Sequence, residues 1–247
     1  MEETQTIRRS KRVVTEELPI VGLNKLSIFD YPKKLCANLI VPGCNFRCPY
    51  CKEKRLIFDF IPMEKISEDK IIELLHPRIG FLDGVCIKGG EPTIHRGLPA
   101  FLARLKSIGC YIKIETNGSH SNRLRDLINR KLVNYITLDI KAPLHKYSEI
   151  VQTKIEQSTI IESIQHIRRS KVDHEFRTMM VPGLIDGDDL IKIAQVLAGS
   201  KRYVLHGFKP GDTLSPECQG ISGYSSNEMA QFRDIVTPYY GEVLLRI

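Results

Sequence analysis

The sequence has no apolar run that approaches the roughly 20 residues a membrane-spanning helix needs. It also lacks a signal peptide, because no apolar stretch follows the basic residues at positions 8–12. Acidic residues at positions 2, 3, 16 and 17 argue against an organelle transit peptide. We therefore expect a cytoplasmic protein that has no membrane partner.

Internal repeats, low-complexity tracts and linkers rich in proline, glycine or serine are absent as well. The 247 residues lie at the upper end of what one hydrophobic core supports. We predict a single domain over residues 18–247, preceded by an N-terminal arm of residues 1–17. Its core spans about 35–208, and a helix and a strand extend it at the C-terminus.

A disulfide framework is not expected, because the seven cysteines are odd in number and no secretory signal precedes them. Three of them fall within eight residues, at Cys44, Cys48 and Cys51. The other four are scattered, and Cys86 and Cys110 are expected to pack in the core beside predicted strands.

Positive charge is in excess, with a net charge of +7 and an isoelectric point of about 9.0. This charge permits a nucleic-acid partner but does not require one. Lysine and arginine are spread along the chain, which favours a solvated basic surface.

Apolar strand patterns alternate with amphipathic helix patterns along the chain, which predicts βαβ units and a parallel sheet. Six units fall between residues 35 and 208, fewer than the eight of a closed barrel. The predicted fold is therefore α/β, a partial (β/α)6 TIM-like barrel. The strands are predicted at 35–41, 84–88, 111–115, 135–140, 175–181, 203–208 and 242–247. The helices are predicted at 67–75, 98–108, 122–131, 158–169, 188–197 and 227–237, with Ser67 and Ser158 as N-caps.

Polar and glycine residues gather where these strands end, which is the edge that carries the chemistry in parallel β/α folds. The candidate site residues at strand ends are Cys44, Cys48, Cys51, Gly89, Gly90, Glu91, Glu115, Thr116, Asn117, Asp139, Lys141, Arg177 and His206.

The cysteine segment has the spacing C-x3-C-x2-C. Three thiolates on one loop can each bind one iron of a cubane and leave the fourth iron open, as a catalytic metal requires. A structural zinc site needs four ligands, but no second CxxC pair exists, and neither His76 nor Cys86 has a suitable spacing. A thioredoxin-type pair of Cys48 and Cys51 would leave Cys44 without a role.

This spacing, with the aromatic Tyr50 just before the last cysteine, resembles the signature of the radical S-adenosylmethionine (SAM) superfamily. The resemblance implies a [4Fe-4S] cluster on Cys44, Cys48 and Cys51, with the amino and carboxylate groups of SAM on the open iron. The reduced cluster then cleaves the C5′–S bond, and the 5′-deoxyadenosyl radical abstracts hydrogen from a substrate. Tyr50 would stack near the adenine or simply pack.

Gly89-Gly90-Glu91 resembles the family's GGE motif, whose backbone and glutamate receive the methionine amino group. A glycine would allow close backbone approach to the ligand, although the segment could also be a plain turn. The resemblance places Glu115, Thr116 and Asn117 beside SAM, although Asn117-Gly118 is also a common turn.

The remaining candidates lie on later strands. Asp139 and Lys141 share one face of their strand, either beside the zwitterionic ligand or as a surface ion pair. By resemblance, Arg177 and His206 approach SAM or its ribose, although a lone histidine is as often structural.

Residues 22–32, 44–51, 138–143 and 176–183 resemble a narrower group, the activating proteins of glycyl-radical enzymes. The similarity is greatest to anaerobic ribonucleoside-triphosphate reductase activating proteins, in the long form without a ferredoxin insertion. It runs from about residue 18 to the C-terminus. It implies a glycyl-radical enzyme as protein substrate and reduced flavodoxin or ferredoxin as electron donor. Close activases often have His-Asn after the last cysteine, where this chain has Lys52-Glu53.

Two alternatives stay open. A radical SAM enzyme could act on a nucleotide, an RNA base or a peptide, and the +7 charge would help there. A non-enzymatic iron–sulfur or zinc protein is the other.

Overall fold

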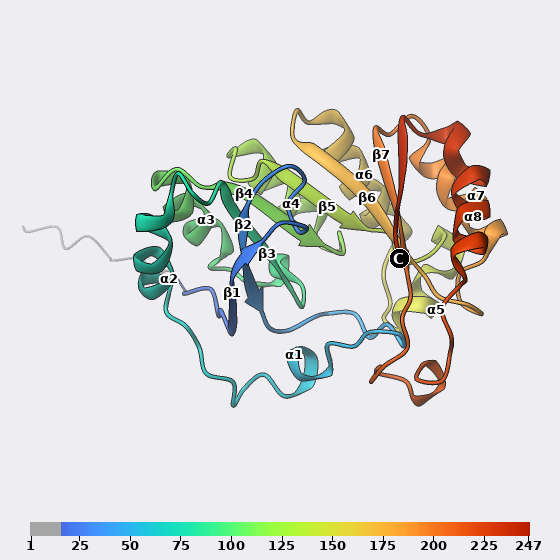
Figure 1. The fold of residues 1–247 in the computed structure, drawn as a ribbon, viewed down its shortest axis with the longest axis horizontal. Coiled ribbons are helices and arrows are strands. Elements are labelled where there is room, and N and C mark those ends of the chain that lie inside the picture. The colour runs from blue at the N-terminus through green and yellow to red at the C-terminus, as the bar shows by residue number, and fades with distance from the viewer. Residues whose placement is uncertain (1–15) are drawn as a thin grey trace, which may run out of the picture.

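The computed structural model describes residues 16–247, so most of the predicted N-terminal arm lies outside the described residues. A single eight-stranded sheet runs in the order β1 to β8, with β1 to β4 toward the left of Figure 1 and β6 and β7 toward the right. Its strands are β1 (Gly22–Ser27), β2 (Cys36–Val41), β3 (Gly84–Gly89), β4 (Tyr111–Thr116), β5 (Tyr135–Asp139), β6 (Asp173–Met180), β7 (Arg202–Gly207) and β8 (Glu242–Arg246).

Strands β2 to β8 are parallel, each hydrogen-bonded to the next along the chain, whereas β1 pairs antiparallel with β2. The predicted partial barrel is confirmed, and two features extend it. β1 was missed, because its residues alternate weakly and much of it is exposed, as is common at a sheet edge. β8 continues the parallel sheet beside β7 as a further β/α unit.

Helices cover the outer side of the sheet, with α2 at one end and α7 and α8 at the other (Figure 1). The helices are α1 (Lys54–Phe58), α2 (Glu68–Leu75), α3 (Leu98–Ser107), α4 (Ser121–Asn129), α5 (Tyr147–Val151), α6 (Gln157–Arg169), α7 (Gly187–Leu197) and α8 (Ser226–Val236). No helix in the described part of the chain is long and apolar enough to span a membrane.

The helix starts follow local capping chemistry. Ser67 caps α2 as predicted, because its side chain accepts a hydrogen bond from the Lys70 amide. The prediction of Ser158 as a cap is wrong: α6 begins at Gln157, and its N-cap Glu156 makes no side-chain capping bond. Ser158 therefore lies inside the first turn.

The core lies between the outer face of the sheet and these helices. Helix α3, for example, turns Leu98, Phe101, Leu102 and Leu105 inward. With the outer face of the sheet covered by helices, the inner face and the carboxyl ends of the strands are left for polar side chains.

Candidate functional site

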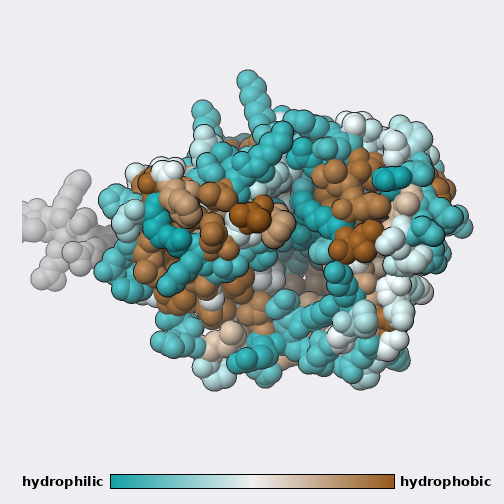
Figure 2. Space-filling view, in the orientation of Figure 1, coloured by the Kyte–Doolittle hydropathy of each residue, from teal (hydrophilic) through white to brown (hydrophobic). Residues whose placement is uncertain are grey.

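A cavity of about 790 Å³ opens at the carboxyl ends of the strands. It is lined by every candidate site residue that the sequence indicated: the three cysteines, Tyr50 and the ten residues at later strand ends. In the space-filling view, the middle of this face is hollowed between two hydrophobic areas (Figure 2). Parallel strands bring their carboxyl ends to one edge, which explains why residues so distant in sequence meet there.

The loop of the three cysteines connects β2 to α1 and is held on one side by β4 and α5. The Asn117 side-chain amide donates to Asn45 Oδ1 at 3.0 Å, and Asn45 in turn donates to Ser119 Oγ at 2.8 Å. The Arg47 amide donates to the Val151 carbonyl at 2.9 Å. These bonds tie the loop to the strand ends that line the cavity.

On its other side, the loop is held by the segment that follows β7, which sequence reasoning missed. The Leu214 amide donates to the Cys51 carbonyl at 2.8 Å, and the Ser215 amide donates to the Pro49 carbonyl at 2.9 Å. Lys54 and Asp212 form an ion pair at 2.5 Å. No local signal in residues 209–219 could have indicated these contacts, because the partner residues are about 160 positions away in the sequence.

Burial raises the pKa of all three thiols, that of Cys48 to about 11, while the Lys141 ammonium opposes the rise. The Phe46 amide donates to Cys44 Sγ at 3.4 Å, and the Asn117 amide group lies 4.0 Å from the same sulfur. Among residues 16–247, no three histidine, cysteine or carboxylate side chains converge as ligands of one metal ion. A cubane requires a different arrangement, since each thiolate binds a separate iron.

The two glycines after β3 are required by the chain's own backbone. A Cβ on Gly90 would lie 1.8 Å from the Gly43 carbonyl oxygen. Gly89 has a φ of +123°, and a Cβ there would lie 2.5 Å from the Val41 carbonyl oxygen. From the sequence, we expected these glycines to allow close approach of a ligand. In the structure, the atoms that a Cβ would meet belong to the cysteine loop and to the end of β2.

The Glu91 carboxylate is 1% exposed and accepts four hydrogen bonds. Its Oε1 accepts from the Thr93 amide and hydroxyl and from the Thr116 hydroxyl, at 2.6–3.0 Å. Its Oε2 accepts from the Asn117 amide at 2.6 Å. Burial raises the pKa of this carboxyl despite the four donors. Glu91 therefore joins the turn after β3 to the end of β4.

Four charged residues alternate in sign along one wall of the cavity. Arg177 pairs with Asp139 at 2.6 Å and with Glu115 at 2.9 Å, and Lys141 pairs with Asp139 at 2.9 Å. Burial would raise the pKa of Glu115, but Arg177 and Lys113 outweigh it and lower it to about 2. Arg177 and Lys141 likewise hold the pKa of Asp139 well below its usual range. All four groups are therefore charged at neutral pH.

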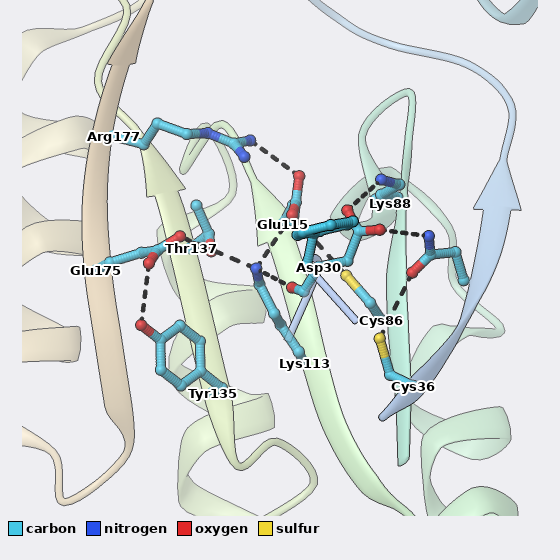
Figure 3. A network of polar contacts seen from close by, with 12 residues as sticks. Asp30, Cys36, Cys86, Lys88, Lys113, Glu115, Tyr135, Thr137, Glu175 and Arg177 are labelled. Carbon is cyan, nitrogen blue, oxygen red and sulfur yellow. Dashed lines mark hydrogen bonds and ion pairs between the residues drawn. The ribbon is translucent and has the colours of Figure 1, made fainter. Parts of the chain in front are cut away.

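A second set of charges, absent from the sequence prediction, continues this wall across the inner face (Figure 3). Lys113 is 0% exposed and lies 3.2 Å from Glu115 and 3.9 Å from Glu175. Arg246 on β8 donates to both oxygens of Glu175 at 3.0 Å. Asp30 pairs with Lys88 at 2.6 Å. The network thus reaches from the loop after β1 to β8.

His206 and Tyr50 complete the set of candidates in the cavity. Burial and the nearby Arg177 lower the pKa of His206, so its ring is neutral at pH 7. Tyr50 is buried, and its hydroxyl has no hydrogen-bond partner among the described residues.

Residues 38–197 match the radical SAM superfamily. Because this match covers more than half of the chain, the chain belongs to that superfamily. Membership implies a [4Fe-4S] cluster and SAM as cofactors, so the protein is a radical SAM enzyme.

Two proteins of Methanocaldococcus jannaschii are similar in sequence, and both are provisionally named glycyl-radical enzyme activating enzymes. One is 31% identical over 92% of this chain and 95% of its own length. The other is 30% identical over 65% of this chain and 62% of its own length. Among solved structures, Streptococcus suis SuiB bound to its precursor peptide SuiA superposes with a TM-score of 0.65 at 12% identity, over 83% of this chain and 46% of SuiB. That likeness concerns the fold.

Proposed function

We propose that this radical SAM enzyme generates a glycyl radical on a partner enzyme such as anaerobic ribonucleotide reductase. The observation that carries the proposal is the similarity along nearly the full length of both chains to a provisionally named activating enzyme. The partner would be a protein substrate, and reduced flavodoxin or ferredoxin would supply the electron.

In this proposal, Cys44, Cys48 and Cys51 each hold one iron of the cluster. The residues fit the group: three sulfur donors lie on one loop that lines the cavity, and the Lys141 ammonium favours their negatively charged thiolate forms. When bound, the cluster supplies the electron that cleaves SAM to the 5′-deoxyadenosyl radical. The loop, fixed from both sides by backbone hydrogen bonds, keeps the three thiolates in place.

The charged wall suits a zwitterionic ligand, because Glu115, Asp139, Lys141 and Arg177 present both signs within a few ångströms. Thr116, Asn117 and neutral His206 add hydrogen-bonding groups in the same cavity, and Tyr50 adds a ring. We assign SAM to this wall.

Glu91 takes a different role from the one expected from the resemblance. Glu91 is 1% exposed and already accepts four hydrogen bonds, three on Oε1 and one on Oε2. We propose that Glu91 positions the backbone of Gly89 and Gly90 against the ligand and does not itself receive the ammonium.

A protein partner is supported by large exposed apolar side chains, one of which lines the cavity. Phe29 lines the cavity and is 83% exposed, and Ile61, close in sequence to the cavity-lining Met63, is 81% exposed. Large exposed apolar side chains beside a site are typical of a surface that contacts another macromolecule. We propose that the glycine-bearing segment of the partner enters here.

A second candidate is an enzyme that acts on a nucleotide or RNA base. Lys52, Arg55 and Lys209 line the cavity, are exposed and form no ion pair within residues 16–247. Three free cations beside the cavity would suit phosphate groups.

The proposal is tested by combining the reconstituted, reduced enzyme with SAM and a candidate glycyl-radical enzyme under anaerobic conditions. We expect 5′-deoxyadenosine together with a glycyl-radical doublet in the electron paramagnetic resonance (EPR) spectrum. The Cys48→Ala variant is the matched control and should give neither. Formation of 5′-deoxyadenosine that rises with a nucleotide, without a radical on any protein, would replace the activase proposal by the second candidate.

A further inference from the structure

The segment between β7 and α8 forms a closed loop against the cysteine loop, and residues 209–222 of this segment are called the strap. The two ends of the strap meet, because a Cβ on Gly223 would lie 2.0 Å from the Phe208 carbonyl oxygen. Compact surface loops whose ends lie close together are frequently functional. The strap touches the chain's three clustered cysteines through backbone groups.

Two consecutive amides of the strap hold the cysteine loop around its last cysteine. The Leu214 amide donates to the Cys51 carbonyl at 2.8 Å, and the Ser215 amide donates to the Pro49 carbonyl at 2.9 Å. Within the cysteine loop, the Cys51 amide donates to the Cys48 carbonyl at 3.0 Å. The backbone from Cys48 to Cys51 is therefore fixed both by its own turn and by the strap.

Thr213 sets the direction of the two strap amides. Its side chain is 0% exposed, and its hydroxyl donates to the Ser215 carbonyl at 2.7 Å. This bond closes a ring that contains the amides of both Leu214 and Ser215, so it limits rotation of the backbone between them. The Ser215 carbonyl also accepts from the Cys218 amide at 3.1 Å, which fixes the far side of the same turn.

We propose that Thr213 is a positioning residue for the cluster. It keeps the two strap amides directed at the cysteine loop, and so keeps the thiolates of Cys48 and Cys51 where they bind iron. The inference rests on the proposed role of the cysteines as ligands. Groups that orient a metal ligand without touching the metal typically change metal affinity by about 10–100-fold when they are mutated. Thr213 acts through the backbone, so the lower end of this range applies.

The test compares substitutions that each remove a buried hydroxyl bonded to a carbonyl. Thr213→Val removes the strap hydroxyl and keeps the shape of the side chain. Ser200→Ala is the matched control, because Ser200 is 3% exposed, donates to the Leu197 carbonyl and does not line the cavity. Thr213→Ser keeps the hydroxyl and is the rescue variant.

Each protein is reconstituted anaerobically, its iron and sulfide are measured, and the release of iron to a chelator is followed without SAM. We expect equal iron content, release about tenfold faster from Thr213→Val, and release near the wild-type rate from Thr213→Ser and Ser200→Ala. In the apo proteins, hydrogen exchange measured by mass spectrometry should be faster in residues 44–51 and 209–219 of Thr213→Val alone. The apo thermal midpoints of Thr213→Val and Ser200→Ala should be similar.

A loaded Thr213→Val protein that releases iron no faster than Ser200→Ala would overturn the inference. A Thr213→Val protein that does not fold would also overturn it, because the hydroxyl would then serve the fold as a whole. A wild-type protein that takes up no cluster would refute the proposed ligands, and the inference with them. A wild type that loads and cleaves SAM, beside a Thr213→Val protein with unchanged release, would refute the inference alone.

Discussion

The cavity has two halves that are built in different ways. One half is the cysteine loop, an irregular segment held mainly by backbone hydrogen bonds to α5 and to the segment after β7. The other half is a wall of side chains on regular strands, where Glu115, Asp139 and Arg177 are held by ion pairs that join β4, β5 and β6. Changes in the loop should therefore affect the cluster, whereas changes in the wall should affect charge balance, SAM binding and stability.

Cys48→Ala should have the largest effect and should affect only the half of the cavity formed by the cysteine loop. The substitution removes one of three sulfur donors, so iron content and SAM cleavage should fall below detection, while the charged wall stays intact. The thermal midpoint of the apo protein should change little, because cysteine and alanine are similar in volume. Cys110→Ala, a buried cysteine away from the cavity, is the control and should retain its cluster. Production of 5′-deoxyadenosine by Cys48→Ala would show that the thiolates are assigned wrongly.

Arg177→Met should have the largest effect on the wall. It leaves the carboxylates of Glu115 and Asp139 without their shared cation, which typically costs about 3–5 kcal/mol for a buried pair. Urea denaturation of the apo protein would measure the loss, and SAM affinity should fall as well. Arg177→Lys keeps the charge but loses the planar fork, so it should recover part of the stability. Full stability in Arg177→Met would mean that the wall is not held by this cation.

The charged wall also predicts that the free energy of unfolding decreases at acidic pH. The folded pKa of Glu115 is about 2, below its ordinary value of 4.5. A depressed carboxyl stabilises the fold above the unfolded pKa, and this contribution is lost as the pH falls from about 4.5 to 2. The shift corresponds to at most about 3.4 kcal/mol. Urea denaturation of wild type and Glu115→Gln across that range should show the difference shrinking toward low pH, and a constant difference would refute the assignment.

Glu91→Gln should produce a smaller effect that involves both halves. The new amide group would face donors, so at least one bond is lost at a cost of about 1–3 kcal/mol. SAM should bind several-fold more weakly while iron content stays near that of wild type. Glu53→Gln alters an exposed carboxyl that also lines the cavity and should change neither. Equal loss of iron and of SAM affinity would make Glu91 a general structural residue.

Asp212→Asn should have the smallest effect. The Lys54–Asp212 pair is largely exposed, and such pairs contribute about 0–1 kcal/mol. The backbone bonds of Leu214 and Ser215 remain in the variant, so iron content and the rate of cluster loss in air should match wild type. A marked loss of iron would mean that the ion pair, and not the backbone, holds this side of the loop.

Much of the fold and site could be predicted from periodicity and motifs. Alternating strand and helix patterns give the parallel sheet, and parallel strands necessarily bring the candidate residues to one edge. The charged inner network could not be predicted, because Lys113 and Glu175 in a strand pattern look like solvent-facing residues until the strand register places them together. Short helices such as α5 and the contacts of residues 209–219 depend on tertiary packing and leave no local pattern.

The central claim is that three cysteines leave one iron of a [4Fe-4S] cluster open to SAM. It is tested most directly by Mössbauer spectroscopy of the ⁵⁷Fe-reconstituted protein, with and without SAM. We predict four irons per chain, one of which changes its isomer shift when SAM is added while the other three do not. Four irons that are all indifferent to SAM, or a protein that takes up zinc and no cluster, would contradict the account.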